Sequence, residues 1–212
     1  MTLKIYGIPA SRAFRAIWMA EELGLAYENV PYGFKGPEIK QAAYLAINPN
    51  GAVPAIDDGG FTLWESMAIN LYLARRYDGG RGLWPEGAEA EARLYQWTFW
   101  AATEIEPRLG NWYYHSRLLP EAERIPELAR RAVAELPRRF SVAEATLKAS
   151  PCLLGQAFTA ADLNVAVTMT RARELGIGDF PALEAWLERC YSRPAAKKAL
   201  ALRAASLEAM AR

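Results

Sequence analysis

The residues best suited to chemistry gather in one stretch, residues 48–66 (NPNGAVPAIDDGGFTLWES). Its Val53-Pro54 pair interrupts a short apolar run, and proline inside a strand removes a hydrogen-bond donor and belongs at an edge or a bend. Such a kink offers backbone groups to a peptide-like ligand. Glu65 and Ser66 then open an apolar helical run, and the start of a helix offers N–H groups and partial positive charge to a carboxylate.

Local turn signals give this stretch a shape. We expect residues 52–56 and 61–64 to form two strands, because Asp-Gly and Gly-Gly in residues 57–60 favour a tight reversal. Ser66 is then the expected N-cap of the helix that follows.

The order of these motifs, NP-x-G-x-VPAI, a hairpin and ES-x-AI, resembles the N-terminal domain of the glutathione transferases. The resemblance implies that glutathione is the co-substrate. In that family the residue before a cis-proline pairs with the glutathione backbone, and the Glu-Ser at the helix start holds the γ-glutamyl group. By this likeness we expect a cis Val53–Pro54 bond, and contacts to glutathione from Val53, Pro54, Glu65 and Ser66.

Ser11 is placed to activate a thiol. It follows the first predicted strand by a short loop and opens the helical run RAFRAIWMAEEL, where the helix dipole favours an anion. The thiol of glutathione should titrate roughly as a cysteine, at about 8.5, so an enzyme that uses it must stabilise the thiolate. In serine-type members of the family a serine in this loop donates its hydroxyl to the sulfur. We therefore expect Ser11 to be catalytic; the alternative is that it only caps the helix.

Two side chains near Ser11, Tyr6 and Arg12, have alternative interpretations. Other classes of the family use a tyrosine at the end of the first strand, where Tyr6 lies, but we expect Tyr6 to be a half-buried strand residue. Arg12 either adds positive potential at the glutathione site or lies on the surface. A third class uses cysteine at the Ser11 position, but the first cysteine here is Cys152, so thiol–disulfide chemistry by the protein's own sulfur is not expected.

The sequence departs from the resemblance at one position. Related motifs often carry Lys, Arg or Gln just before the Val-Pro pair, and this chain has Ala52. The contact to the glycyl end of glutathione then needs a substitute, for which Lys40 is our choice and Lys35 or Gln41 are alternatives.

The small hydrophobic electrophile is expected against the loop after the first strand and the first long helix. Phe14, Trp112 and Arg108 are the residues that we expect to contact it. The alternative for such residues is packing within the core, because several aromatic and polar side chains recur there at helical spacing: Trp97, Trp100, Glu104, Arg108, Asn111 and Trp112.

The predicted elements form an α/β thioredoxin-like N-terminal domain followed by an all-α helical bundle domain. Residues 2–6 and 27–30 read as strands around the helix that begins near Ser11, residues 33–47 as part loop and part short helix, and the hairpin and third helix complete a βαβ-ββα order. The expected domains are residues 1–79 and 88–212, joined by a Gly- and Pro-rich linker.

Helices are expected throughout the second domain. Residues 88–115 and 122–149 read as long helices, the second made uncertain or kinked by Pro126 and Pro137. Thr159 and Asp162 have the spacing of a capping box on an almost wholly apolar, hence central, helix. A helix from Pro181 and a final helix after Pro194 follow.

Composition excludes several classes of function. The 212 residues include 25 basic and 24 acidic side chains, so no broad basic surface for nucleic acid is expected. The sequence has no signal-peptide pattern and no apolar run long enough to span a membrane. His115 is the only histidine, which argues against a histidine metal site and a Ser-His-Asp relay.

The sequence therefore predicts a cytoplasmic, homodimeric glutathione transferase that conjugates the glutathione thiolate to small hydrophobic electrophiles. The same thiolate could instead serve an isomerase, dehalogenase or peroxidase reaction; the SSCS signature of the isomerase members is missing, since this loop reads PASRAF. A non-catalytic, glutathione transferase-like binding domain is the alternative from another class.

Overall fold

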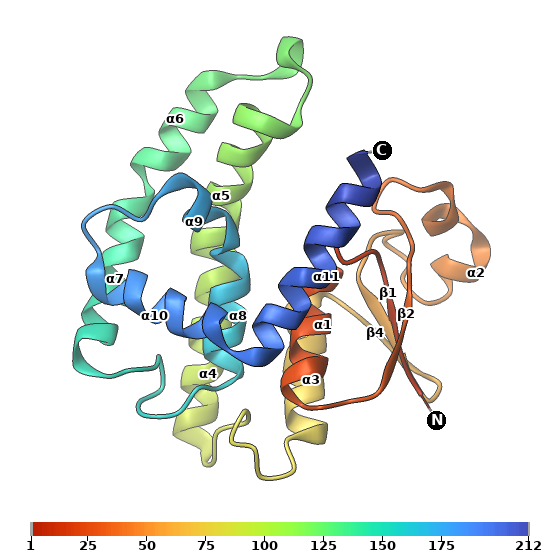
Figure 1. Cartoon of the computed structure of the whole chain (residues 1–212), viewed down its shortest axis with the longest axis horizontal. Coiled ribbons are helices and arrows are strands. Elements are labelled where there is room, and N and C mark those ends of the chain that lie inside the picture. The colour runs from red at the N-terminus through yellow and green to blue at the C-terminus, as the bar shows by residue number, and fades with distance from the viewer. Residues whose placement is uncertain (1, 212) are drawn as a thin grey trace. The chain divides into compact units, whose positions relative to one another are not determined.

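The computed structural model describes residues 2–211 (Figure 1). The chain divides into two compact units, Met1–Trp84 with Tyr191–Arg212, and Pro85–Cys190. The first unit has the thioredoxin-like arrangement of a four-stranded sheet and helices, and the second is helical, which is the expected fold class.

The sheet of the first unit has the strand order β2-β1-β3-β4. Strands β1 and β2 run parallel, whereas β3 is antiparallel to both β1 and β4. Ile5 of β1 lies opposite Ile56 of β3, and both side chains are fully buried, so the middle of the sheet is core. The strands are β1 (Leu3–Tyr6), β2 (Tyr27–Val30), β3 (Ala55–Asp58) and β4 (Phe61–Trp64).

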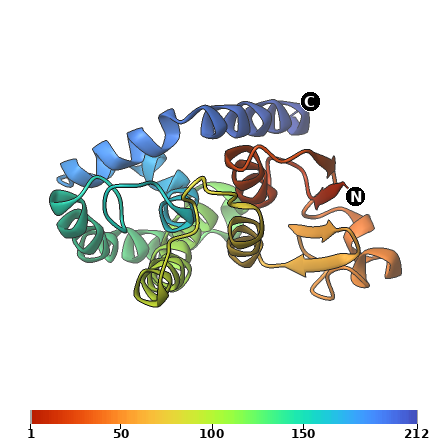
Figure 2. The same cartoon turned by 90° about the horizontal axis from the view of Figure 1, so that it is seen from below.

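Helix α1 is the central helix of the first unit. Seen nearly end-on in Figure 2, it lies between α3 and α11, and residues 13–20 are all buried. Helix α11, which we expected in the 88–212 domain, packs against α1 and belongs to the first unit. Residues 33–47 contain a 3₁₀ turn and a short helix, as expected. The helices are α1 (Ala13–Glu22), a 3₁₀ turn (Pro37–Lys40), α2 (Ala42–Leu45), α3 (Ser66–Tyr77) and α11 (Pro194–Ala211).

The hairpin differs from its prediction by about three residues. The first strand begins at Ala55, after the proline, and the expected strand at residues 52–56 is therefore wrong. Asp57 and Asp58 pair with Thr62 and Phe61, so the reversal consists of Gly59-Gly60 alone, both with positive φ. Two glycines tolerate that backbone at little cost, which lets the ladder extend through both aspartates.

The second unit consists of helices in the chain order that the sequence predicts. Helix α8 lies alongside α4, and α5 packs against α6 (Figure 1). The elements are α4 (Ala88–Trp100), a π turn (Ala101–Ile105), α5 (Glu106–Tyr113), a second π turn (Tyr114–Leu118), a 3₁₀ turn (Glu121–Glu123), α6 (Pro126–Ala134), α7 (Leu136–Ala149), α8 (Ala160–Thr168), α9 (Thr170–Leu175) and α10 (Pro181–Ser192).

Prolines lie at two of the interruptions in the long helices. Pro107 has no N–H to bond the Thr103 carbonyl four residues earlier, and the π turn lies immediately before it. The guanidinium of Arg108 donates to that Thr103 oxygen at 2.7 Å instead. Pro126 and Pro137 fall at the first turns of α6 and α7, so the segment expected as one helix at residues 122–149 is two helices.

Helix α8 is buried along its whole length, and its capping box is formed as predicted. The Asp162 carboxylate accepts hydrogen bonds from Thr159 N, Leu153 N and the indole of Trp186, each at 2.9 Å. This one carboxylate therefore ties the start of α8 both to the loop before it and to α10.

Candidate functional site

The loop after β1 brings two predicted site residues to one point. Gly7 has φ of 127°, a region that L side chains rarely adopt. A Cβ placed on Gly7 would lie 3.0 Å from Val53 Cβ and 3.2 Å from Ser11 Oγ. It would also lie 2.9 Å from Ala13 Cβ, at the start of α1. Glycine is therefore required here, and its missing side chain lets Ser11, Ala13 and Val53 all lie close to the backbone of residue 7.

The hydroxyl of Ser11 is held from both sides. Its Oγ donates to the carbonyl of Ile8 at 2.7 Å and accepts from the N–H of Ala13 at 3.1 Å. Helix α1 begins at Ala13 with Arg12 in the N-cap position, so the predicted helix start at Ser11 is early. The hydroxyl nevertheless caps the first N–H of the helix, and that contact makes it a stronger donor through hydrogen-bond polarisation.

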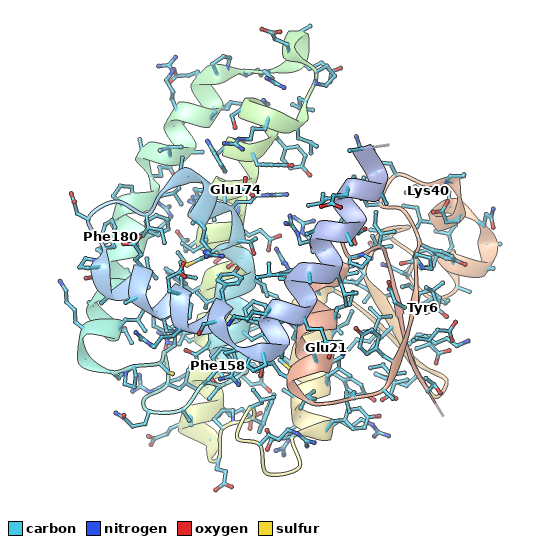
Figure 3. All side chains as sticks on the ribbon, viewed as in Figure 1. Tyr6, Glu21, Lys40, Phe158, Glu174 and Phe180 are labelled. Carbon is cyan, nitrogen blue, oxygen red and sulfur yellow. The ribbon has the colours of Figure 1, made fainter. Side chains whose placement is uncertain are left out.

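Tyr6 lies in the aromatic core of the first unit (Figure 3). Its ring is 5.8 Å from that of Tyr32 and 5.9 Å from that of Tyr44 between centroids, and the side chain is buried. Burial raises the pKa of the Tyr6 hydroxyl above its ordinary value. A weaker acid is a weaker hydrogen-bond donor, so this environment suits a packing residue better than a thiol activator.

The segment before Pro54 is shaped by side chains from the neighbouring turn and helix. The Ala52 carbonyl accepts from the Tyr44 hydroxyl at 2.6 Å and from Asn48 Nδ2 at 2.7 Å. The Val53–Pro54 bond is cis, as predicted. Within residues 2–211, the N–H and carbonyl of Val53 take part in no hydrogen bond, so both remain available to an extended ligand backbone.

Lys40 lies next to this segment, on the part of the chain that carries α2 (Figure 3). Lys40 is exposed, as are Lys35 and Gln41, and its Nζ donates to the Gly51 carbonyl at 2.9 Å. Arg12 is exposed at the start of α1. A cation beside residues 51–53 is therefore present despite the alanine at position 52.

Glu65 and Ser66 lie at the start of α3, but the N-cap is Glu65 and not Ser66 as predicted. Glu65 occupies the N-cap position with φ of 71°, a value rare outside glycine. Ser66 is the first helical residue and not the N-cap. Its hydroxyl is buried and accepts a hydrogen bond of 3.2 Å from the guanidinium of Arg15, which is itself buried on α1.

Arg15 was missed in the sequence, although a signal was present. It is a charged residue among apolar neighbours on a helix whose residues 13–20 are all buried. A buried cation needs a partner, and the start of α3 provides one in Ser66.

Phe14, expected to contact an electrophile, is buried within the first unit. Its ring packs 5.9 Å from that of Trp18, and the guanidinium of Arg203 on α11 lies over it at 5.9 Å. On the same helix, Ser206 Oγ accepts a hydrogen bond of 3.2 Å from Ala10 N. No local sequence pattern marks these two α11 residues, because their positions relative to α1 follow from tertiary packing alone.

Arg108 belongs to a charged cluster of the helical unit. Its Nε lies 3.1 Å from Glu135 Oε2 and its guanidinium 3.7 Å from Glu104, while Arg139 lies 2.9 Å from Glu104. The hydrogen bond from Arg108 lowers the pKa of Glu135. These pairs join α5 and the preceding π turn to α7, so much of the bonding capacity of Arg108 is used within the unit.

Trp112 packs in the same helical unit. It forms a hydrophobic cluster with Ala129 and Ala132 of α6, and Arg117 lies 5.4 Å from its ring centroid. Trp97 and Trp100 stack edge to face at 5.1 Å. These three tryptophans therefore pack largely against other side chains of the unit. Packing of this kind is the alternative to a role in substrate binding.

Neither metal nor membrane features were found in the part of the chain that the structure describes. Across residues 2–211, no three His, Cys, Asp or Glu side chains are grouped as metal ligands. In the same range, no helix combines the length and apolar character needed to cross a bilayer.

Comparison with known proteins gives matches over most of the chain. Residues 1–75 match the family model of the glutathione S-transferase N-terminal domain, and residues 113–194 match that of its C-terminal domain. The chain is 34% identical over 208 residues to glutathione S-transferase 3 of Zea mays, covering 94% of this chain and 93% of that protein. It is 32% identical over 209 residues to the disulfide-bond oxidoreductase YfcG of Escherichia coli, covering 93% and 94%.

Solved structures agree with this relationship. The theta class glutathione S-transferase of Xanthomonas axonopodis pv. citri, crystallised with glutathione bound, superimposes with a TM-score of 0.86 and 30% identity. That match covers 93% of this chain and 96% of the other. The family models, the sequence identity and the fold lead to one conclusion: the chain belongs to the glutathione S-transferase family.

Proposed function

We propose that this protein is a serine-type glutathione transferase that conjugates glutathione to small hydrophobic electrophiles. The observation that carries the proposal is the convergence of Ser11 Oγ and Val53 at Gly7. A ligand backbone paired with Val53 would present its cysteine side chain close to the Ser11 hydroxyl. Family membership supports the same reading, since a relative with this fold is known with glutathione bound.

In this mechanism Ser11 stabilises the thiolate. Its hydroxyl has one proton, which is hydrogen-bonded to the Ile8 carbonyl. To donate to the glutathione sulfur, the hydroxyl must therefore give up its bond to Ile8. Lowering the thiol pKa by about two units requires roughly 2.7 kcal/mol. A hydrogen bond to a charged acceptor contributes about 1.5–3 kcal/mol, from which the neutral bond given up subtracts about 1 kcal/mol. The dipole of α1 adds about 0.3–1 kcal/mol, so Ser11 and the helix together supply a shift of about one to two units.

The rest of glutathione is assigned to the two neighbouring segments. Val53, beside Pro54, pairs with the tripeptide backbone, and the start of α3 at Glu65 and Ser66 holds the γ-glutamyl group. We assign Lys40 to the glycyl carboxylate, because its Nζ already lies beside Gly51, and Arg12 to the positive potential of the site. With an aryl halide, the sulfur forms a bond to the ring carbon, halide leaves with its electron pair, and the thiol proton passes to water.

The electrophile residues, the domain roles and the assembly are also proposals. We assign glutathione binding to residues 1–79 and the main electrophile contacts to residues 88–212, where Trp112 and Arg108 are the candidate residues. Phe14 is the candidate within residues 1–79. Homodimers acting in the cytoplasm are the proposed working form.

Binding to immobilised glutathione followed by assay with an aryl halide tests the proposal. Retention, elution by free glutathione and release of one halide per conjugate are the expected results. Failure to bind glutathione would contradict it and favour a non-catalytic relative. Glutathione-dependent reduction of a small disulfide without aryl transfer would instead assign the reaction named for the Escherichia coli relative.

A further inference from the structure

Helix α11 contacts both ends of α1, although the two helices are separated by most of the chain. At the C-terminal end of α1, Arg193 donates to both carboxylate oxygens of Glu22 at 2.7 Å, and Lys198 lies 2.8 Å from Glu21. Glu21 lies where the two helices meet (Figure 3). Carboxylates at a helix C-terminus are unfavourable next to the dipole, so these cations offset a local cost as well as fixing α11.

At the other end, α11 reaches the loop that carries Ser11. Arg203 lies over the ring of Phe14, and Ser206 accepts the hydrogen bond of Ala10 N. Residues 203 and 206 are three apart and therefore share one face of the helix. Ala10 directly precedes Ser11, so this contact lies one residue from the hydroxyl proposed to bind sulfur.

Different parts of this loop, residues 7–11, are held by hydrogen bonds to different partners. Its beginning is anchored by Gly7 N to Val30 O at 2.8 Å and Ile8 N to Tyr32 O at 2.9 Å. Its middle is a local turn, closed by Ser11 N and Ser11 Oγ on the Ile8 carbonyl. Among the hydrogen bonds found in residues 2–211, Ser206 supplies the one that ties this middle part to a distant segment.

We propose that Ser206 is a positioning residue for Ser11, and that thiolate stabilisation therefore depends on the C-terminal helix. The inference rests on the proposed function and adds a requirement to it, namely that Ser206 of α11 holds the loop that carries Ser11. When glutathione takes the Ser11 proton, the turn loses the side-chain bond to Ile8. The hydrogen bond between Ala10 and Ser206 does not involve the Ser11 hydroxyl. It therefore persists when the hydroxyl turns from Ile8 to the sulfur, and it keeps Ser11 in place.

The test compares Ser206→Ala with the wild-type protein by titrating the ultraviolet absorbance of bound glutathione thiolate. The thiol pKa should rise by about 0.5–1 unit in the variant, the effect expected for losing one neutral hydrogen bond. The kcat at neutral pH should fall by about three- to tenfold, while the Kd for glutathione should change by less than about twofold, because Val53, Glu65 and Ser66 are unaltered. Ser206→Thr keeps the hydroxyl and should restore the wild-type pKa.

Two controls separate positioning from general stability. Arg193→Met releases the same helix at its other end, so it should lower Tm while leaving the thiol pKa in place. Ser141→Ala, on an exposed helix surface of the second unit, should change neither. A wild-type thiolate signal that Ser206→Ala leaves unshifted would overturn this inference alone. Absence of any thiolate signal in the wild-type protein would overturn the proposed function, and this inference with it.

Discussion

The guanidinium of Arg15 donates a hydrogen bond of 3.2 Å to the buried hydroxyl of Ser66, across the contact between α1 and α3. This bond links the helix that follows the Ser11 loop to the helix start proposed to bind the γ-glutamyl group. Arg15→Met keeps the apolar stem but removes the donor. The variant should weaken glutathione binding by about three- to tenfold, measured by calorimetry, because the start of α3 loses its support.

A double-mutant cycle checks the same pair independently of any ligand. Arg15→Met and Ser66→Ala should each lower the free energy of unfolding, with a coupling energy of about 1 kcal/mol between them. Strict additivity would mean that the two side chains do not stabilise each other.

Asp162→Ala should cost about 3 kcal/mol in the free energy of unfolding, measured by denaturant titration. Loss of a helix cap alone costs about 1 kcal/mol, but the backbone N–H of Leu153 and the indole of Trp186 would also be left buried without an acceptor. Activity per folded molecule should be nearly unchanged. Trp186→Phe removes one donor while keeping the carboxylate and should cost less; an unaltered melting curve for Asp162→Ala would mean that this cap does not support α8.

Asp78→Asn should make the protein less dependent on pH in the acid range. The carboxylate accepts from the backbone N–H groups of Gly80, Gly82, Leu83 and Trp84. Burial opposes ionisation of Asp78, but these four hydrogen bonds outweigh it and lower its pKa. A lowered pKa in the folded state contributes stability above the unfolded pKa of about 4, and that stability is lost as the pH falls through the folded value.

The wild-type protein should therefore be more stable than Asp78→Asn by about 1–2 kcal/mol at pH 7, a difference kept small by partial exposure of the group. The difference should shrink in melting experiments below about pH 4. Asp179→Asn, at an exposed position of the second unit, is the matched control. A difference that stays constant down to about pH 2 would show that ionisation of Asp78 is not responsible.

Sedimentation equilibrium should give about twice the chain mass of 23.6 kDa at micromolar concentration. Strand β4 is an edge strand whose Phe61 and Trp64 side chains are 49% and 39% exposed. An apolar edge of this kind is normally covered. Replacing both residues by glutamate should give the mass of one chain. If the wild-type protein already sediments as one chain, the dimer is excluded.

The sequence predicted the elements whose signals are local. The Thr159–Asp162 capping box and the first-turn proline of α10 follow from residue types at fixed spacings, and both are confirmed. The cis Val53–Pro54 bond, expected from the family resemblance, is confirmed as well. Errors arose where two local signals competed. Asp57 and Asp58 are turn formers, but two glycines after them sufficed for the reversal, and the aspartates joined the strand.

Several contacts at the candidate site could not be predicted from the sequence. Ser11 and Val53 were paired through a family resemblance, but the need for glycine at position 7 comes from distances that only the folded chain has. Arg15, Arg203 and Ser206 were missed because their partners lie 51, 189 and 196 positions away. Helical periodicity predicts which face of a helix a residue lies on, but it does not predict which other segment of the chain packs against that face.

The pH dependence of kcat/KM shows whether the Ser11 hydroxyl stabilises the glutathione thiolate. Ser11→Ala should move the profile upward by about 0.5–1.5 units, since the thiolate loses the hydroxyl donor but keeps the helix dipole, with a smaller change in glutathione affinity. Tyr6→Phe, which removes only a hydroxyl from the aromatic core, should leave the profile in place. A profile that shifts in Tyr6→Phe and stays unchanged in Ser11→Ala would make Tyr6 the thiol activator and leave Ser11 as a helix cap.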